Sequence, residues 1–145
     1  MQRISSSSSE LETAEAGAAL ARTLARGAVV YVEGELGAGK TAFVRGAAQA
    51  LGVRDQVTSP TFTIAHLYEG DDGPVAHLDL YRSVSLGDEE LADLEPYFDE
   101  VRATFIEWAG RGAGMLPPPD VRVHLRIAGA DAREIEVLGA SPESH

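Results

Sequence analysis

The chain has 145 residues and no cysteine, so it is long enough for one domain with a real core but cannot form disulfides or a cysteine-based nucleophile or metal site. Its 23 acidic residues outnumber 12 basic ones and give a net charge of −11, which argues against a protein that binds RNA or DNA by itself. No apolar run approaches the ~18 residues of a membrane helix and the first residues are polar, so we expect a cytoplasmic protein with no membrane partner.

A strand and a capped helix are predicted at the start of the chain. Arg3-Ile4 is a candidate for a short first strand. Ser9 and Glu12 have the spacing of a capping box, with Ser9 as the N-cap and Glu12 as the third helical residue. An alanine-rich helical pattern continues to Arg26, and Gly27 follows as a typical helix stop. We therefore expect a first helix that ends at Arg26.

A phosphate-binding loop comes next. The stretch Gly34–Thr41 reads G-x-x-x-x-G-K-T, after an apolar strand pattern over Ala28–Glu33 and before a helix expected from Lys40 to Leu51. Backbone N–H groups and the helix dipole would surround a phosphate, the lysine would reach the β- and γ-phosphates, and the threonine hydroxyl would hold Mg²⁺. The predicted nucleotide-binding residues of this stretch are Gly34, Gly37, Ala38, Gly39, Lys40, Thr41 and Ala42.

Composition strengthens this interpretation of the loop. Among 12 basic residues Lys40 is the single lysine, and the other 11 are arginine. A compact ammonium fits among phosphate oxygens better than a planar guanidinium does. The alternative, a glycine-rich turn with a solvated surface lysine, does not explain why lysine occurs at this position alone.

Two strands are predicted in the middle of the chain. They cover Phe62–Tyr68 and Val75–Leu80 and are joined by a turn over Glu69–Pro74. Strand alternation places His77 and Asp79 on one face of the second strand. A carboxylate in such an apolar stretch is costly to bury unless it is paired or meets a metal.

The C-terminal part alternates strands with loops. We expect a helix over Asp88–Phe98, a buried strand over Ala103–Ile106 and a Gly- and Pro-rich loop over Ala109–Pro119. Val121–Ile127 alternates in polarity as a half-exposed strand does, and Arg133–Leu138 is predicted to return as its hairpin partner. Residues 1–138 would thus form one domain, and residues 139–145 a flexible tail.

A phosphate loop needs a second acid to complete the Mg²⁺ shell and a group that places water. Asp79 and Glu107 both end apolar strands, so one would hold Mg²⁺ and the other would orient or deprotonate the attacking water. The sequence leaves open which acid has which role, and it also leaves open a purely structural ion pair with Arg82 or Arg111.

Thr61 precedes a strand, where switch loops place a hydroxyl near the γ-phosphate, although an ordinary turn threonine fits equally well. The predicted catalytic residues are Glu107, Asp79, Lys40 and Thr61.

The remaining chemically versatile side chains carry weaker signals. His66, His77 and His124 show no metal-ligand spacing, and we interpret them as structural. Trp108 is either a core anchor or an exposed contact for a partner. GTP-specific recognition through an N/T-K-x-D motif is excluded, because the chain has no asparagine and its one lysine belongs to the loop.

Four motifs in order resemble the TsaE (YjeE) family of small bacterial ATPases, which are needed to make threonylcarbamoyladenosine in tRNA. The resemblance covers roughly residues 10–137. The motifs are Gly34–Thr41, Val57-Thr58-Ser59-Pro60-Thr61-Phe62-Thr63, His77-Leu78-Asp79-Leu80-Tyr81-Arg82 and Ile106-Glu107-Trp108.

The resemblance implies an α/β P-loop NTPase fold with three layers and a central parallel sheet with antiparallel edge strands. It implies ATP and Mg²⁺ at the loop, with Thr41, Asp79 and Glu107 around the metal, and it points to Glu10 and Arg133 beside the nucleotide base. It further implies weak ATPase activity alone and action on a TsaD–TsaB heterodimer, through which tRNA would be met indirectly. A small nucleotide or metabolite kinase, and a nucleotide-gated binding module without turnover, remain the alternatives.

Overall fold

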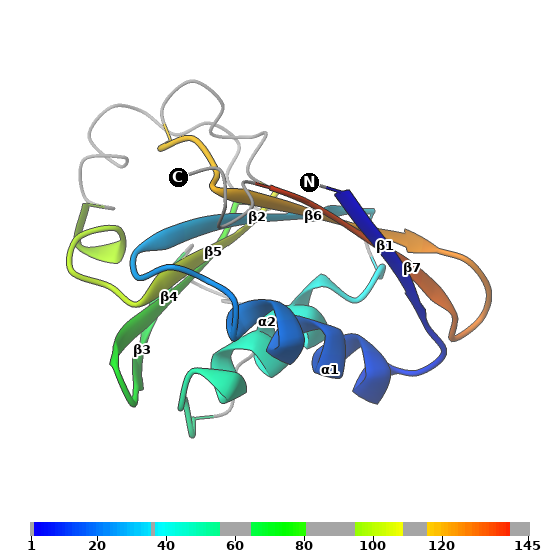
Figure 1. The fold of residues 1–145 in the computed structure, drawn as a ribbon, viewed down its shortest axis with the longest axis horizontal. Helices are drawn as coiled ribbons and strands as arrows, with labels where there is room; N and C mark the ends of the chain where they lie inside the picture. Colours follow the sequence, from blue (N-terminus) through cyan, green and yellow to red (C-terminus); the bar gives the residue numbers. More distant parts are fainter. Residues whose placement is uncertain (1, 36, 56–64, 81–94, 109–115, 140–145) are drawn as a thin grey trace.

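The computed structural model describes residues 2–35, 37–55, 65–80, 95–108 and 116–139, and the statements below concern these residues. The strands are β1 (Gln2–Ser7), β2 (Ala28–Gly34), β3 (Ala65–Gly70), β4 (Gly73–Asp79), β5 (Ala103–Glu107), β6 (Val121–Ile127) and β7 (Arg133–Gly139). The helices are α1 (Glu10–Ala21), α2 (Lys40–Ala50) and the short 3₁₀ helix η1 (Glu95–Tyr97). The strands form one sheet, and the two α-helices fall in the first half of the chain, between β1 and β2 and between β2 and β3 (Figure 1). None of the helices described is long and apolar enough to cross a membrane.

The described strands form a single sheet in the order β1-β7-β6-β2-β5-β4-β3. The central strands β6, β2, β5 and β4 are parallel, whereas β3 at one edge and β7 and β1 at the other are antiparallel. This confirms the predicted central parallel sheet with antiparallel edges. Because β2, β4 and β5 run in the same direction, their carboxyl-terminal ends lie together at one end of the parallel strands. Ligands of α/β proteins bind at this end of the sheet.

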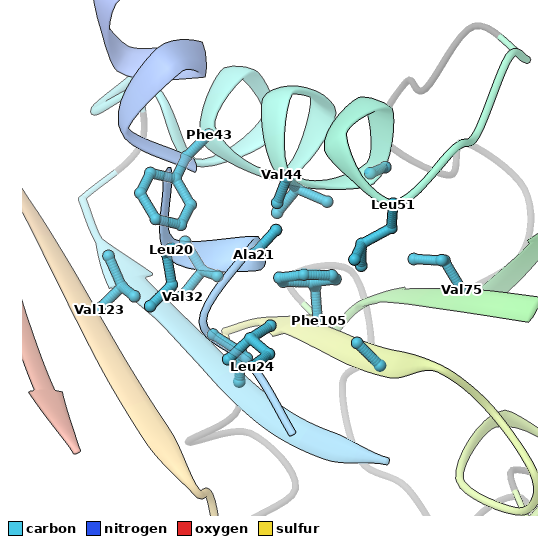
Figure 2. Close-up of a cluster of buried hydrophobic side chains, with 14 of the residues drawn as sticks. Leu20, Ala21, Leu24, Val32, Phe43, Val44, Leu51, Val75, Phe105 and Val123 are labelled. Carbon is cyan, nitrogen blue, oxygen red and sulfur yellow. The ribbon is translucent and has the colours of Figure 1, made fainter. Parts of the chain in front are cut away.

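Both helices pack on one face of the sheet and enclose the main core (Figures 1 and 2). In Figure 2, Phe43 and Val44 of α2 face Val32 of β2 and Phe105 of β5, and the four side chains are fully buried. A second, smaller cluster lies on the opposite face of the sheet. Successive side chains of a strand point to opposite faces, so the residues next to those in the main core belong to this cluster. Its buried members are Val29, Ala65, Ala76, Leu78, Leu80 and Ile106, with Tyr97 of η1 packed against them.

The two helices cross with direct backbone contact at two glycines. A Cβ added to Gly17 of α1 would lie 2.0 Å from the carbonyl oxygen of Phe43, and one added to Gly46 of α2 would lie 1.8 Å from that of Ala14. Real Cβ atoms do not approach backbone oxygens this closely, so any side chain here forces the helices apart. The position of α2, and with it the loop at its start, therefore depends on these glycines.

We predict that Gly46→Ala destabilises the protein. Overpacking against rigid backbone costs about 3 kcal/mol, which corresponds to a fall in Tm of about 6 to 12 °C. Thermal unfolding followed by circular dichroism measures the change. Gly129→Ala is the matched control, because a Cβ there meets only the Ala132 side chain at 3.4 Å. Equal Tm values for the two variants would contradict the packing argument.

The N-terminus of α1 is capped as predicted, with one difference. The Ser9 hydroxyl accepts a hydrogen bond from the backbone N–H of Glu12 at 3.0 Å, which confirms Ser9 as the N-cap. The Glu12 carboxylate, however, accepts from the backbone N–H and hydroxyl of Ser8 at 2.8 and 3.0 Å instead of returning to Ser9. The cap thus involves one residue more than a capping box does.

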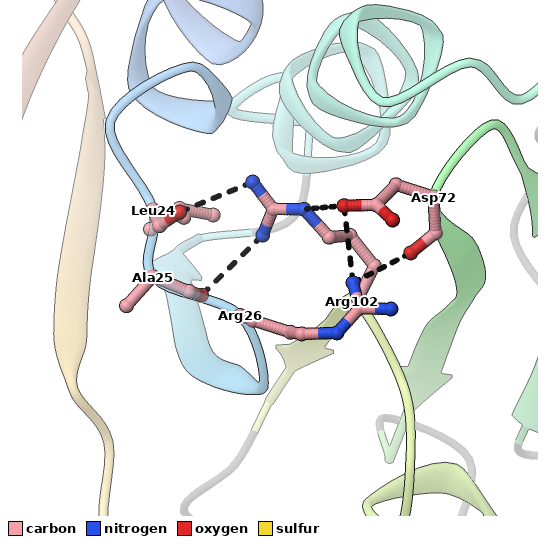
Figure 3. A network of polar contacts seen from close by, with 5 residues as sticks. All are labelled: Leu24, Ala25, Arg26, Asp72 and Arg102. Carbon is pink, nitrogen blue, oxygen red and sulfur yellow. Dashed lines mark hydrogen bonds and ion pairs between the residues drawn. The ribbon is translucent and has the colours of Figure 1, made fainter.

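The end of α1 was predicted wrongly, since the helix stops at Ala21 and not at Arg26. The Thr23 hydroxyl donates to the Leu20 carbonyl at 2.8 Å, and tertiary contacts hold the segment that follows. Figure 3 shows the Arg102 guanidinium donating to the carbonyls of Leu24 and Ala25, at 3.1 and 3.3 Å. These carbonyls therefore have a partner outside the helix.

The β3–β4 hairpin is tighter than expected. We predicted a turn over Glu69–Pro74, but β3 reaches Gly70 and β4 begins at Gly73, so the connection is Asp71-Asp72 alone. In Figure 3, Arg26 donates to the Asp72 carbonyl at 2.7 Å and pairs with its carboxylate at 3.1 Å. This long-range anchor, together with glycines on both sides, allows the short turn.

Several predicted features fall wholly or partly outside the described residues. They are Leu36 of the loop, Thr61, the first residues of the 62–68 strand, most of the expected Asp88–Phe98 helix, Arg82, Arg111, most of the 109–119 loop and the tail after Gly139. Of the expected 88–98 helix, Glu95–Tyr97 is described, and it is 3₁₀-helical.

Candidate phosphate and metal site

The loop between β2 and α2 has the backbone shape that its glycines permit. Gly39 is the N-cap of α2 in the left-handed region, with φ of 96°, and no side chain caps the helix. Gly34 has φ of 152°, and a Cβ there would lie 2.6 Å from the Leu125 carbonyl oxygen of β6. Gly39 has no side chain with which to cap the helix, and the N–H groups at the start of a helix are a common anion-binding position.

Lys40 lies against the loop itself. Its Nζ donates to the carbonyl oxygens of Gly34 and Glu35, at 2.7 and 2.9 Å. The ammonium also sits 4.3 Å from the ring centroid of Trp108, within the range of a cation–π contact. Burial lowers the pKa of Lys40, and the carboxylates of Glu107 and Asp79 oppose this shift. Two loop carbonyl oxygens therefore hold the Lys40 ammonium next to the loop, and phosphate oxygens could take their place.

The two predicted acids end neighbouring parallel strands in register. Asp79 of β4 lies opposite Glu107 of β5, and both are close enough to Lys40 to influence its pKa. The Glu107 side chain is 3% exposed. The hydroxyl of Thr41, in the first turn of α2, donates to Oε2 of Glu107 at 3.3 Å. The fold thus brings Lys40, Thr41, Asp79 and Glu107 together from three separate elements.

Their donor atoms suit a hard cation. Thr41, Asp79 and Glu107 offer oxygen only, and Mg²⁺ is usually held by one or two carboxylates together with substrate phosphates. Among the described residues no three His, Cys, Asp or Glu side chains gather to hold a metal ion on their own. The oxygen donors of Thr41, Asp79 and Glu107 therefore fit Mg²⁺.

A residue that sequence reasoning treated as structural also belongs to this site. His77 of β4 is fully buried, and its Nε2 lies 2.6 Å from Oε2 of Glu107. The sequence already predicted that His77 and Asp79 lie on the same face of one strand. Glu107, however, is 30 residues further along the chain, and the β4–β5 pairing that joins the two cannot be read from the sequence.

Trp108 packs as the first of its two predicted alternatives expects, and its role as a contact for a partner stays a prediction. It packs against the smaller apolar cluster, while its ring meets the Lys40 ammonium. Its backbone lies in the left-handed region with φ of 60°, which is strained for a bulky residue. Such strain typically occurs where a side chain is held for function. The contact with Lys40 makes Trp108 a neighbour of the loop as well as a packing residue.

Arg133 and Glu10 were expected beside a nucleotide base. Arg133, the first residue of β7, donates to the carbonyl oxygens of Ala38 and Gly37, each at 3.2 Å. It thereby supports the loop from the edge of the sheet. Glu10, the first residue of α1, pairs with Arg45 of α2 at 3.0 Å. Both contacts place these residues next to the loop-and-helix unit, and their contact with a base stays a prediction.

Comparison with known proteins places this geometry in a family context. Residues 7–135 match the family model "Threonylcarbamoyl adenosine biosynthesis protein TsaE". The chain is 39% identical over 139 residues to the tRNA threonylcarbamoyladenosine biosynthesis protein TsaE of Treponema pallidum, covering 90% of this chain and 96% of that protein. The TsaE protein of Streptomyces coelicolor is 49% identical over 127 residues, covering 83% and 84% of the two chains. The crystal structure of Bacillus subtilis YdiB superposes with a TM-score of 0.76 at 31% identity, over 99% of this chain and 88% of that one.

Proposed function

Because the chain belongs to the TsaE family, whose role is in tRNA threonylcarbamoyladenosine biosynthesis, we propose that it is an ATPase that binds ATP and Mg²⁺ at the Gly34–Thr41 loop. One observation carries the proposal. The Thr41 hydroxyl lies 3.3 Å from the Glu107 carboxylate, beside the Lys40 ammonium and the uncapped start of α2. A cation, an anion-binding helix end and a pair of hard oxygen donors are the parts that phosphoryl transfer to water requires.

Each residue has a defined part in this proposal. The N–H groups of the loop bind the phosphates, and Lys40 exchanges the Gly34 and Glu35 carbonyls for phosphate oxygens. Thr41 and one of the two acids hold Mg²⁺, which when bound neutralises charge on the phosphates. The other acid orients the attacking water or accepts its proton. We assign this part to Glu107, because it is the more buried of the two and its carboxylate is held by hydrogen bonds.

The partner in this proposal is the TsaD–TsaB pair that the family resemblance implied. The net charge of −11 supports a division of labour in which the partners, and not this chain, contact the tRNA phosphates. ATP binding or turnover here would then reset the complex that modifies the adenosine next to the anticodon. Activity of this chain alone would be weak.

The test is phosphate release from labelled ATP, measured with and without a TsaD–TsaB pair. We expect slow release by the chain alone and faster release with the pair. Transfer of the label to a small acceptor would favour a kinase instead. ATP-dependent capture of the pair without any phosphate release would favour a nucleotide-gated binding module. Either of these results would overturn the ATPase proposal.

The Arg133 contacts predict a defect in nucleotide affinity. Arg133→Ala removes two hydrogen bonds to loop carbonyls, so the loop is less ordered before it binds, and the Kd for ATP should rise about 10-fold. Fluorescent-nucleotide titration measures the change. Arg126→Ala is the matched control, since Arg126 on neighbouring β6 contacts only Glu134 and Glu136 among the described residues. The same Kd in both variants would contradict a role of Arg133 in loop order.

A further inference from the structure

The buried contact between His77 and Glu107 has no role in the proposed function. Nε2 of His77 lies 2.6 Å from Oε2 of Glu107, and the two side chains are 1% and 3% exposed. A contact this short and this well shielded from water restrains both side chains, because breaking it would leave polar groups buried without partners.

The chemistry of the two groups fixes the direction of the hydrogen bond. An ionised carboxylate only accepts, so Nε2 of His77 carries the hydrogen and donates. The other ring nitrogen of His77 is Nδ1. It is buried and has no hydrogen-bond partner among the described residues.

Both hydrogen bonds to this carboxylate reach the same oxygen. Oε2 accepts from His77 on β4 and, at 3.3 Å, from Thr41 on α2, while Glu107 itself is on β5. Neither of these two hydrogen bonds, which are the ones found for the Glu107 carboxylate among the described residues, reaches Oε1. The two donors thus orient the carboxylate about its χ angles and leave Oε1 as the oxygen that faces other partners.

We propose that His77 is a positioning residue for ATP hydrolysis, which holds Oε2 of Glu107 and presents Oε1 to the attacking water. His77 does not touch the substrate and acts only through Glu107. The inference rests on the proposed function, since it presumes that Glu107 takes part in hydrolysis. A purely structural His–Glu pair would support folding without changing turnover.

The test compares His77→Leu with His77→Gln, under conditions in which the parent protein turns over. The leucine variant should lose kcat about 10- to 100-fold, the usual effect of removing a partner that orients a ligating or reacting group, while KM stays within about twofold. The amide nitrogen of glutamine reaches the position of Nε2, so His77→Gln should recover most of the lost kcat. His66→Gln, opposite His77 on β3, should behave like the parent. If His77→Leu does not fold, His77→Asn replaces it, because its amide stops short of Glu107.

A double variant separates this proposal from the proposed function. His77→Leu combined with Glu107→Gln should turn over no more slowly than Glu107→Gln alone. Full turnover by Glu107→Gln would overturn the assigned role of Glu107 and the role of His77 with it. If Glu107→Gln is slow but His77→Leu lowers only Tm and keeps the parent kcat, the positioning role alone is wrong. Equal kcat losses in His77→Gln and His77→Leu would also overturn it, because the donated hydrogen bond would then not matter.

Discussion

Lys40→Ala is expected to weaken ATP binding so far that concentrations that saturate the parent protein leave most of the variant unoccupied. The substitution removes the only lysine and with it the ammonium that would contact two phosphate oxygens. Charge-assisted hydrogen bonds are worth about 1.5 to 3 kcal/mol each, so the loss of about 3 kcal/mol raises Kd about 100-fold. Isothermal titration with ATP and Mg²⁺ measures the affinity, and phosphate release measures turnover.

Lys40→Arg is the informative control for this variant. It keeps the positive charge but replaces a compact ammonium by a planar guanidinium, in a site where Nζ lies within 2.9 Å of two loop carbonyls and 4.3 Å from the Trp108 ring. We expect Lys40→Arg to bind weakly as well. Parent-like affinity in Lys40→Ala, with an unchanged Tm, would show that nucleotide phosphates do not bind at this loop.

The second large effect is expected for Glu107→Ala, which should keep nucleotide binding and lose hydrolysis. Most phosphate contacts come from the loop and Lys40, so Kd should change little. Loss of the group that orients or deprotonates water lowers kcat about 10²- to 10⁴-fold. Single-turnover phosphate release, with protein in excess over ATP, separates the two quantities. Glu107→Gln, which keeps the size of the side chain, excludes a packing defect as the cause.

Asp79→Asn decides between the two acids. If Asp79 completes the Mg²⁺ shell, this variant should need more Mg²⁺ for the same ATP affinity, while Glu107→Gln should not. If Asp79→Asn instead binds Mg²⁺ and ATP normally and loses only turnover, the two assignments must be exchanged. Glu33→Gln, whose parent carboxylate pairs with Arg122 on the sheet surface at 2.8 Å, serves as a control for removal of one negative charge.

Local sequence patterns predicted the elements around the loop closely. The strand expected over 28–33 is β2 at Ala28–Gly34, and the helix expected over 40–51 is α2 at Lys40–Ala50. A strand buried on both faces and a glycine-bounded helix are signals carried by neighbouring residues. The C-terminal hairpin, expected over 121–127 and 133–138, also matches β6 and β7, because apolar and polar residues alternate clearly along 121–127.

Predictions failed where distant residues decide the outcome. Nothing near Ala21 in the sequence ends α1 clearly, whereas Arg102 donates to the carbonyls of Leu24 and Ala25 from 78 and 77 residues away. Likewise, the two-residue turn of the β3–β4 hairpin is held by Arg26, 46 residues from the carbonyl of Asp72 that it binds. Helix propensity and turn composition cannot register such contacts.

For the site, the sequence by itself determined the Gly34–Thr41 loop, its single lysine and threonine, and two acids at strand ends, because a short motif and the alternation of an apolar strand contain that information. It did not determine which side chains meet. The tertiary structure decided that β4 and β5 lie side by side, so that Nε2 of His77 contacts Oε2 of Glu107 while Thr41 reaches the same carboxylate oxygen from α2. It also decided that Arg133 supports the loop, from 95 and 96 residues away. The physical reason is that a buried carboxylate or a strained loop needs hydrogen-bond partners, and the order of strands in the sheet, not the order of residues in the chain, selects them.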